Sequence, residues 1–458
     1  MSTTARLPWL AGTPRLAMIV ERLTATPAIP VLIAIVLGLY RIGDRSIWLD
    51  EGVAVAIARA RTTEMLNFVR NTELHASPFY ILLHPWTFLG TSETAVRSLA
   101  VVFGVLAVLA TWSVGKRYGV AFGAALILSV TPVFIEYEQE ARVYTLLMAM
   151  SAISTLLYLR VTERWTLLRA GLYVPAAGVM IYLHPIGAFV VVAHALAVLL
   201  FRPRREWLRL LAMFIPVVVL WIPMISFAMR NGDRIAWIPP LSFDLAFTHM
   251  VALGGGLVAS SVLLVLLVIG ARRDVITLWL LVPIVGIVAL SLFVQPTLQK
   301  HYLLLVIPAA AIIAARNRPD SIAVLISVSL VGVWNWYDRG VKDDWRGAAA
   351  WVTANVEPGD GIVFDPNYLR QAYGFYAQEP EPVWPVFEWS ASPLRAKLDD
   401  FTRFDDVDRI WLVESYDYAG RPDVVAALGD FAPVETRQFA GGQDVRVTLL
   451  VRDPEPAE

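Results

Sequence analysis

Two adjacent carboxylates, Asp50 and Glu51, follow the first long apolar run of this chain. Trp48 precedes them, and the apolar stretch 53–58 that comes after them is too short to cross a membrane. This pattern predicts a helix at the membrane surface with both acids in its first turn, where the helix dipole favours negative charge. A carboxylate placed there can take a proton from a hydroxyl group. Acids also stabilise helix starts without any chemical role, so the pair alone leaves both interpretations open.

The composition of the chain is that of a membrane protein. Of its 458 residues, 57% are hydrophobic and only 17% are charged, which is too apolar for a soluble protein of this length. A polytopic membrane protein is the ordinary explanation. The absence of cysteine excludes disulfides and thiolate metal sites. No motif specifies a cofactor, and a requirement for a divalent cation stays open.

Hydropathy predicts a polytopic helical protein with about eleven membrane-spanning segments, several of them short. They cover approximately residues 26–43, 95–114, 118–135, 141–160, 169–184, 186–201, 209–229, 247–270, 274–294, 301–315 and 320–336.

Basic residues alternate between the two sides of this predicted arrangement. One side carries 16 lysines and arginines, which include Arg6, Arg15 and Arg22 before the first span. The short loops on the other side carry only Arg142, Arg230, Arg234 and Lys300. Because cytoplasmic loops are enriched in Lys and Arg, the N-terminus is predicted to be cytoplasmic. The loop that holds Asp50 and the C-terminal segment are then predicted to lie outside the cell membrane.

Residues 337–458 differ in character from the rest of the chain. They hold 23 of the 39 acidic residues but only 12 of the 38 basic ones. Their pattern predicts a small α/β domain, accessory to a catalytic membrane domain over residues 1–336. Its expected elements are a helix that runs from about Lys342 through Val352, strands at 361–364, 408–414, 433–439 and 445–452, and helices at about 392–403 and 421–429. No nucleotide-binding or zinc-binding motif occurs in it.

The first outer loop, about 44–95, is predicted to contain two surface helices, which begin at Thr62 and at Ser77. His75 and His84 lie in this loop. Each is more simply explained as a hydrogen-bonded structural histidine than as a metal ligand, because no carboxylate lies at ligand spacing beside it.

Three further outer segments carry charged or aromatic groups. In the second outer loop, Glu136 and Glu140 are expected to share a helical face near Arg142. The long loop 230–247, which contains Trp237, suggests a mobile gate. The tenth span opens with Lys300, His301 and Tyr302. A lysine and a histidine there can simply extend to the interface, or they can hold a phosphate at headgroup depth.

The order of these stretches resembles the GT-C glycosyltransferases. The similarity is greatest to bacterial members of glycosyltransferase family 39, which are relatives of protein O-mannosyltransferases and of the lipid A aminoarabinose transferase. No single motif is specific to this family. The order of the motifs and their shared side of the membrane are specific, and the resemblance covers nearly the full chain. The stretches that carry it are Trp48 to Glu51, His75 to His84, Gln139 to Tyr144, His301-Tyr302 ahead of Pro308, and Asp343 to Ala349.

The resemblance implies a polyprenyl-phosphate sugar donor and transfer to a hydroxyl acceptor on a lipid, glycan or protein outside the membrane, with inversion at the sugar. Asp50 is expected to act as the general base and Glu51 to orient it, while Glu140 positions the acceptor or stabilises charge on the sugar ring. The expected ligands of the donor phosphate are Arg142, Lys300, His301 and Tyr302. The expected lining of the donor or acceptor pocket is Trp48, His75, Tyr80, His84 and Trp237.

Two other function classes fit part of the pattern. A proton-coupled transporter also has many spans and charges near an outer gate. Against it, the sequence shows no internal repeat, and its charges collect on one face of the membrane. A structural or sensory protein with a binding domain outside the cell is the third class. A transporter predicts uptake into vesicles, whereas a transferase predicts consumption of a lipid-linked sugar.

Overall fold

The computed structural model describes residues 22–231, 235, 237–339, 341–377, 383–384, 404–416, 424 and 428–452. The chain divides into two compact units. The first, here called the helical unit, comprises Met1–Tyr40, Leu74–Phe79 and Arg97–Arg339. The second, the sheet unit, comprises Arg41–Glu73, Tyr80–Val96 and Gly340–Glu458.

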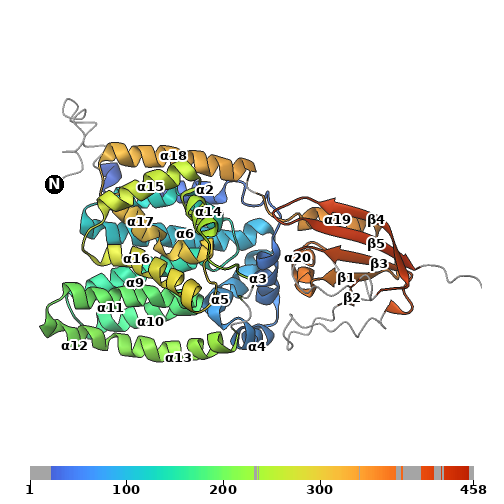
Figure 1. Ribbon diagram of the computed structural model, residues 1–458, viewed down its shortest axis with the longest axis horizontal. Coiled ribbons are helices and arrows are strands. Elements are labelled where there is room, and N and C mark those ends of the chain that lie inside the picture. Colours follow the sequence, from blue (N-terminus) through green and yellow to red (C-terminus); the bar gives the residue numbers. More distant parts are fainter. Residues whose placement is uncertain are drawn as a thin grey trace, which may run out of the picture. The chain divides into compact units, whose positions relative to one another are not determined.

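The helical unit is a bundle of apolar helices (Figure 1). Its elements in chain order are α2 (Ala28–Leu39), α6 (Glu93–Gly115, shared with the sheet unit at its start), α7 (Ala121–Ser129), α8 (Pro132–Glu138), α9 (Tyr144–Glu163), α10 (Leu167–Leu183), α11 (Ala188–Phe201), α12 (Arg204–Ala212), α13 (Phe214–Arg230), α14 (Phe243–Gly254), α15 (Leu257–Gly270), α16 (Val275–Phe293), the 3-10 helix η8 (Lys300–Val306), α17 (Ile307–Ala314) and α18 (Pro319–Arg339).

Several of these helices are long and apolar enough to cross a membrane. Within the described residues, five meet that requirement, and two bent helix pairs raise the number to seven if each pair is one span. Four shorter apolar helices accompany them. The protein is therefore a multi-pass membrane protein, as predicted, while the number eleven stays a prediction.

Two predicted spans are not continuous helices, so the crossing of the membrane by each of them as one span stays a prediction. The segment 118–135 bends by 63° between α7 and α8, and the segment 247–270 bends by 88° between α14 and α15. Pro132 begins α8, and a proline cannot donate the hydrogen bond that would continue α7. Gly255, with φ of +81°, ends α14 in a left-handed conformation that glycine adopts without steric cost.

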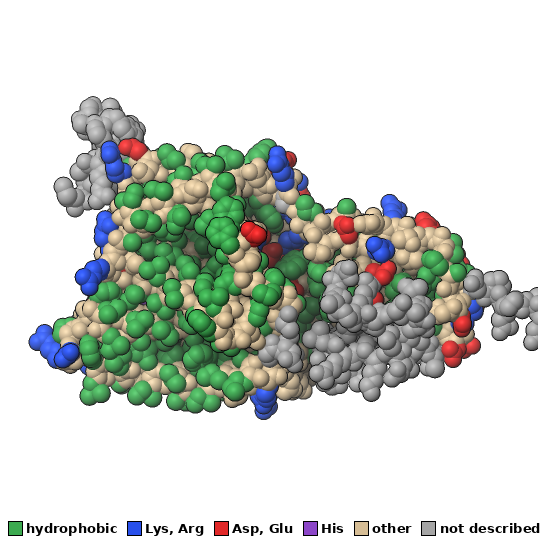
Figure 2. Space-filling model, in the orientation of Figure 1, with side chains coloured by type: hydrophobic (Ala, Val, Ile, Leu, Met, Phe, Trp, Pro, Cys, Tyr) green, Lys and Arg blue, Asp and Glu red, His purple; other side chains and the backbone are tan. Residues whose placement is uncertain are grey.

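Apolar side chains also cover the outside of the helical unit. Figure 2 shows hydrophobic side chains across the face formed by α13 to α16, with lysines and arginines gathered at the end where α12 lies. Ile215, Val219 and Val285 are among the exposed residues of this face. Large exposed apolar areas of this kind are stable in lipid but not in water.

The sheet unit combines segments from the first outer loop with the C-terminal segment. Its five strands are arranged in the order β2-β1-β3-β5-β4, with β1 parallel to β2 and β3, and β5 antiparallel to β3 and β4. The elements are α3 (Leu49–Arg59), α4 (Thr62–Thr72), most of α5 (Ser77–Trp86), α19 (Trp345–Asn355), α20 (Arg370–Tyr373), β1 (Gly361–Asp365), β2 (Val383–Trp384), β3 (Arg409–Glu414), β4 (Phe431–Phe439) and β5 (Val445–Arg452).

These elements confirm the four predicted strands and the predicted starts of α4 and α5, whereas α19 begins a few residues later than predicted, at Trp345. The predicted helix 392–403 lies outside the described residues, as does most of 421–429. Packing groups the first outer loop with the C-terminal segment. The boundary at residue 336 was placed by hydropathy, which reports membrane crossing and not packing, so it stays a prediction.

The predicted orientation is open to a direct test. A reporter fused after Arg205 should be active in the cytoplasm, and one fused after Arg346 should be active outside, because Lys and Arg concentrate in cytoplasmic loops. Alkaline phosphatase and green fluorescent protein fusions distinguish the two sides. Cytoplasmic signals from both positions would contradict the arrangement.

Candidate active site

The carboxylate pair lies where the sequence places it, in the first turn of α3 in the sheet unit. Trp48 is the extended N-cap residue, and Asp50 and Glu51 follow in the first turn. Glu51 is fully buried, whereas Asp50 is only partly buried. The two acids therefore have different surroundings although they are neighbours in sequence. Asp50 is the more exposed of the two.

Glu51 forms an ion pair with a lysine from the C-terminal segment. The Nζ atom of Lys342 lies 3.0 Å from Oε2 of Glu51, and the two side chains are 6% and 0% exposed. The same ammonium group lies 6.0 Å from the centre of the Trp48 ring. An isolated carboxylate in such a position would be costly, so the pair stabilises the buried position of Glu51.

Backbone contact fixes the next residue, Gly52. A Cβ atom at this position would lie 2.6 Å from Cα of Ala372 in α20, a distance that real side chains do not tolerate. Leu49, one turn earlier, packs against the hydrophobic core that is centred on Trp345 and Phe364. The start of α3 is thus held directly against the C-terminal part of the sheet unit.

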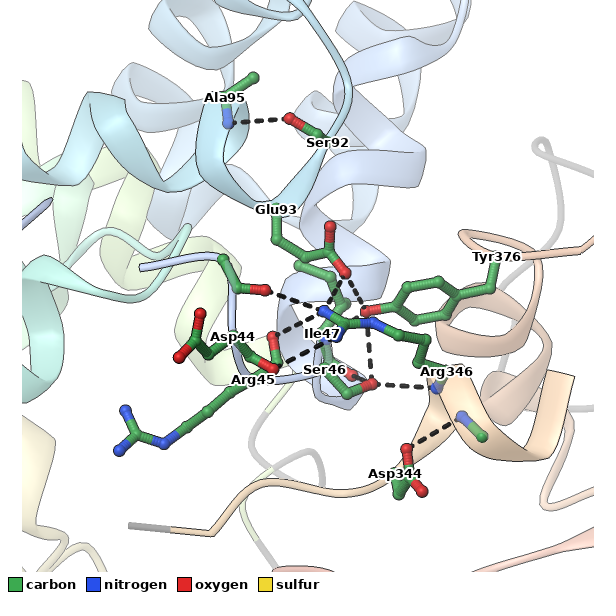
Figure 3. Close-up of polar contacts among 12 residues, drawn as sticks. Asp44, Arg45, Ser46, Ile47, Ser92, Glu93, Ala95, Asp344, Arg346 and Tyr376 are labelled. Carbon is green, nitrogen blue, oxygen red and sulfur yellow. Dashed lines mark hydrogen bonds and ion pairs between the residues drawn. The ribbon is translucent and has the colours of Figure 1, made fainter. Parts of the chain in front are cut away.

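The residues just before α3 are held by a polar network (Figure 3). The guanidinium of Arg346 lies 2.6 Å from Oε1 of Glu93, and the Tyr376 hydroxyl donates to the same oxygen at 2.9 Å. The amide of Ile47 donates to the Tyr376 oxygen at 2.6 Å, and Ser46 accepts from the amide of Arg346 at 3.1 Å. Burial, together with the charge of Glu93, raises the pKa of Tyr376 to about 12, so its hydroxyl keeps its proton and remains a donor.

His84 and Tyr80, two predicted pocket residues, are packed within the sheet unit. The ring nitrogens of His84 lie 2.7 Å from the carbonyl oxygen of Ala58 and 3.0 Å from Oγ1 of Thr62. The histidine thereby joins the end of α3 to the start of α4, which favours a structural role. Tyr80 is only 1% exposed. Both roles in a substrate pocket stay predictions.

In the helical unit, aromatic and imidazole rings form a continuous chain, here called the imidazole cluster. His75 lies 6.4 Å from His184, and His184 lies 4.4 Å from Tyr302, measured between ring centres. Tyr302 lies 4.5 Å from His301, which in turn lies 4.8 Å from Tyr144. Three of the predicted site residues, His75, His301 and Tyr302, therefore belong to one group.

Cations surround this cluster. The Arg142 guanidinium lies 5.9 Å from the Tyr144 ring centre, and Arg142 and Lys300 are both close enough to His301 to interact with it electrostatically. Lys300 is also paired with Glu136 at 2.7 Å. The structure thus brings together all four residues predicted to bind the donor phosphate. Arginine, lysine and imidazole N–H groups are the usual partners of a phosphate.

The expectation that Glu136 and Glu140 share a helical face is wrong. Helix α8 ends at Glu138, and the next residue, Gln139, leaves the helix. Its side-chain amide donates to the carbonyl oxygens of Gly38 at 3.2 Å and Tyr40 at 2.7 Å, at the end of α2. These bonds to a distant segment replace the helical continuation. Glu140 consequently lies in a buried turn.

Trp237, the last predicted pocket residue, lies in the loop between α13 and α14. Its indole is 65% exposed, unlike the buried and partly buried rings of the imidazole cluster. Residues 232–234 and 236 of the same loop lie outside the described residues, so the predicted gate stays a prediction.

Two histidines of the site were not predicted. His184 lies at the centre of the imidazole cluster, and His249 in α14 interacts electrostatically with His301. Their signal in the sequence was present, because a titratable residue within an apolar span is costly and marks a functional position. His184 also precedes Pro185, at the break between two apolar segments. As for a divalent cation, no group of three or more His, Asp or Glu residues in the described parts of the chain could hold a metal ion.

Comparison with known proteins identifies the architecture. The family model described as dolichyl-phosphate-mannose-protein mannosyltransferase matches residues 75–229. The crystal structure of ArnT from Cupriavidus metallidurans in the apo state superimposes with a TM-score of 0.62, over 92% of this chain and 97% of that one, at 15% sequence identity. The chain has the GT-C glycosyltransferase fold.

The same enzyme bound to undecaprenyl phosphate gives a TM-score of 0.59 with equal coverage and 15% identity. No curated protein sequence matches the chain. The resemblance to GT-C glycosyltransferases that was inferred from the sequence is confirmed, and the family-model match covers His75, Tyr80, His84, Glu140 and Arg142.

The backbone contact at Gly52 predicts a measurable cost. Gly52→Ala should lower stability by about 1–3 kcal/mol, because the new methyl group must displace the backbone of α20. Gly171→Ala in α10 is the matched control, since no atom lies within 4 Å of its added Cβ. Alanine there should be neutral or stabilise the helix by up to about 1 kcal/mol. Thermal unfolding of both purified variants measures the difference, and equal melting temperatures would contradict the packing described for Gly52.

Proposed function

We propose that this protein transfers a glycosyl group from a polyprenyl-phosphate sugar to a hydroxyl acceptor at the extracytoplasmic side of the cell membrane. The observation that carries the proposal is the GT-C fold, which matches ArnT over 92% of the chain, and ArnT has been solved with undecaprenyl phosphate. The imidazole cluster with its adjacent cations supports a site for a lipid-linked phosphate. The partly buried Asp50 at the start of α3 supports a base.

In the proposed reaction, a carboxylate oxygen of Asp50 takes the proton of the acceptor hydroxyl. The acceptor oxygen attacks the anomeric carbon of the sugar, and the bond from that carbon to the phosphate oxygen breaks. The electron pair leaves with the polyprenyl phosphate. A single displacement of this kind inverts the configuration at the sugar and needs no covalent intermediate. The phosphate is already a good leaving group, so no general acid is required.

The imidazole cluster acts on the leaving group in this proposal. As the sugar–phosphate bond breaks, negative charge builds on the phosphate oxygens, and fixed cations stabilise it. In this role Arg142 supplies a cation and His301 a hydrogen bond from its imidazole, and Lys300 supplies a further cation although it is shared with Glu136. Glu140 supports the acceptor or the positive charge that develops on the sugar ring.

The direct experiment is an assay of the purified protein in lipid with a panel of polyprenyl-phosphate sugars. A transferase releases polyprenyl phosphate and makes a glycosylated acceptor, which mass spectrometry detects. Uptake of a solute into sealed vesicles, with no consumption of any lipid-linked sugar, would instead support the transporter class. Inversion is read from the anomeric configuration of the product by NMR.

Replacement of the proposed base should abolish transfer. Asp50→Asn keeps the shape of the side chain but cannot accept a proton, so turnover should fall by about 10²–10⁴-fold while thermal stability changes little. Asp44→Asn is the control, because Asp44 lies in the same loop and is half exposed in an ion pair with Arg41. It should retain normal turnover. Normal turnover in Asp50→Asn would remove this residue from the role of base.

The phosphate ligands should affect both donor binding and turnover. His301→Ala and Arg142→Ala should each weaken donor affinity by about 10- to 100-fold and lower the rate, since each removes a charged or polar hydrogen-bond partner. His301→Arg should keep part of the activity because a guanidinium also binds phosphate. The exposed Arg230, predicted on the same side of the membrane, is the control, and Arg230→Ala should bind the donor normally. Unchanged donor kinetics in both cluster variants would refute the assignment.

A further inference from the structure

Glu51 receives its cation from a residue 291 positions further along the chain. Resting on the proposed function, in which Asp50 is the base, we propose that Lys342 is a positioning residue for glycosyl transfer. In this role its ammonium group holds Glu51, and through the shared backbone it fixes the direction in which the neighbouring Asp50 presents its carboxylate. The acidic C-terminal segment is then part of the catalytic apparatus and not only an accessory.

Burial gives the first reason. Glu51 has no exposed surface and Lys342 is 6% exposed, so the two charges face each other where little water can screen them. Loss of the Lys342 charge removes this attraction and lets the Glu51 side chain shift. A shift of Glu51 displaces the peptide plane that it shares with Asp50, and so changes the direction of the Asp50 side chain.

The second reason is that the start of α3 has little freedom elsewhere. The segment before α3 is held by the hydrogen bond from the Ile47 amide to Tyr376. Gly52, which follows Glu51, lies against the backbone of Ala372. Glu51 is the only acid of the pair that is fully buried among these fixed points. A change at Lys342 therefore acts between two fixed points, Ile47 and Gly52, and Asp50 lies between them.

The third reason is that Lys342 is itself held rigidly. The next residue, Asp343, is 3% exposed and accepts hydrogen bonds from the Gln443 amide at 2.8 Å and the Tyr416 hydroxyl at 2.5 Å. Burial, followed by the charges of Asp343 and Asp50, raises the pKa of Tyr416, so its hydroxyl remains a donor. The influence of Asp50 on Tyr416 also shows that the base lies near this anchored turn.

A positioning role makes a different prediction from a purely structural one. A structural pair contributes to stability, and its loss lowers the amount of folded protein without changing the kinetics of each folded molecule. A positioning pair sets the geometry of the base, so its loss lowers kcat while the KM for the donor is kept, because the donor phosphate is bound elsewhere. Displacement of a catalytic group by about 1 Å can cost 10²-fold in rate.

The experiment compares variants of the full-length protein in lipid. Lys342→Met should lower kcat by about 100-fold with the donor KM within about twofold of wild type. Lys342→Arg keeps the charge and should recover at least part of the rate. Because Lys342→Met leaves a buried carboxylate without its cation and can fail to fold, the double variant Lys342→Met with Glu51→Gln removes both charges. It should fold and remain slow, since the ion pair that holds the Glu51 side chain is then absent.

Arg409→Met is the matched control. Arg409 is a partly buried cation of the same sheet unit, and it pairs with Asp360 at 3.5 Å and with Glu357, within the C-terminal segment. Its loss should lower the melting temperature but leave kcat unchanged. A wild-type kcat in folded Lys342→Met or in the double variant, with Asp50→Asn inactive in the same assay, would overturn the positioning role alone. Full turnover in Asp50→Asn would instead overturn the proposed function and this inference with it.

Discussion

The buried ion pair between Glu51 and Lys342 ties the start of α3 to the C-terminal segment, and much of the sheet unit depends on it. Burying one charge without its partner is far more costly than burying both together. The pair therefore forms only when the first outer loop and the C-terminal segment pack as one unit. The contact at Gly52 and the network around Arg346 reinforce the same packing. This explains why the sheet unit combines segments that are far apart in the sequence.

Polar groups in the helical unit obey the same constraint in a lipid environment. Backbone and side-chain polar groups that face no water must find partners within the protein. The broken helices serve this purpose, because the end of α8 and the 3-10 helix η8 place Gln139, His301 and Tyr302 where regular helices would point them elsewhere. His184 lies at such a break as well. Irregular backbone within the membrane unit thus coincides with the residues that carry charge or hydrogen-bonding groups.

Local patterns in the sequence account for a large part of this description. Apolar length predicted the membrane helices, the pattern of the C-terminal segment predicted the four strands, and the acids after Trp48 predicted the start of α3. The order of weak motifs predicted the GT-C fold, which the comparison with ArnT confirms. The helix break at Pro132 was also readable, because proline cannot continue a helix, but hydropathy averaged over a window concealed it.

The remaining features were decided by contacts between distant residues, which no local pattern encodes. The sequence alone determined that Asp50 and Glu51 begin a helix, since capping and dipole effects act within one turn. Only the tertiary structure decided that Glu51 is buried against Lys342 while Asp50 stays accessible. The helical continuation expected from Glu136 to Glu140 failed for the same reason, because Gln139 bonds to carbonyl groups of α2 about a hundred residues away. Burial depends on which segments meet, and that is a property of the folded chain as a whole.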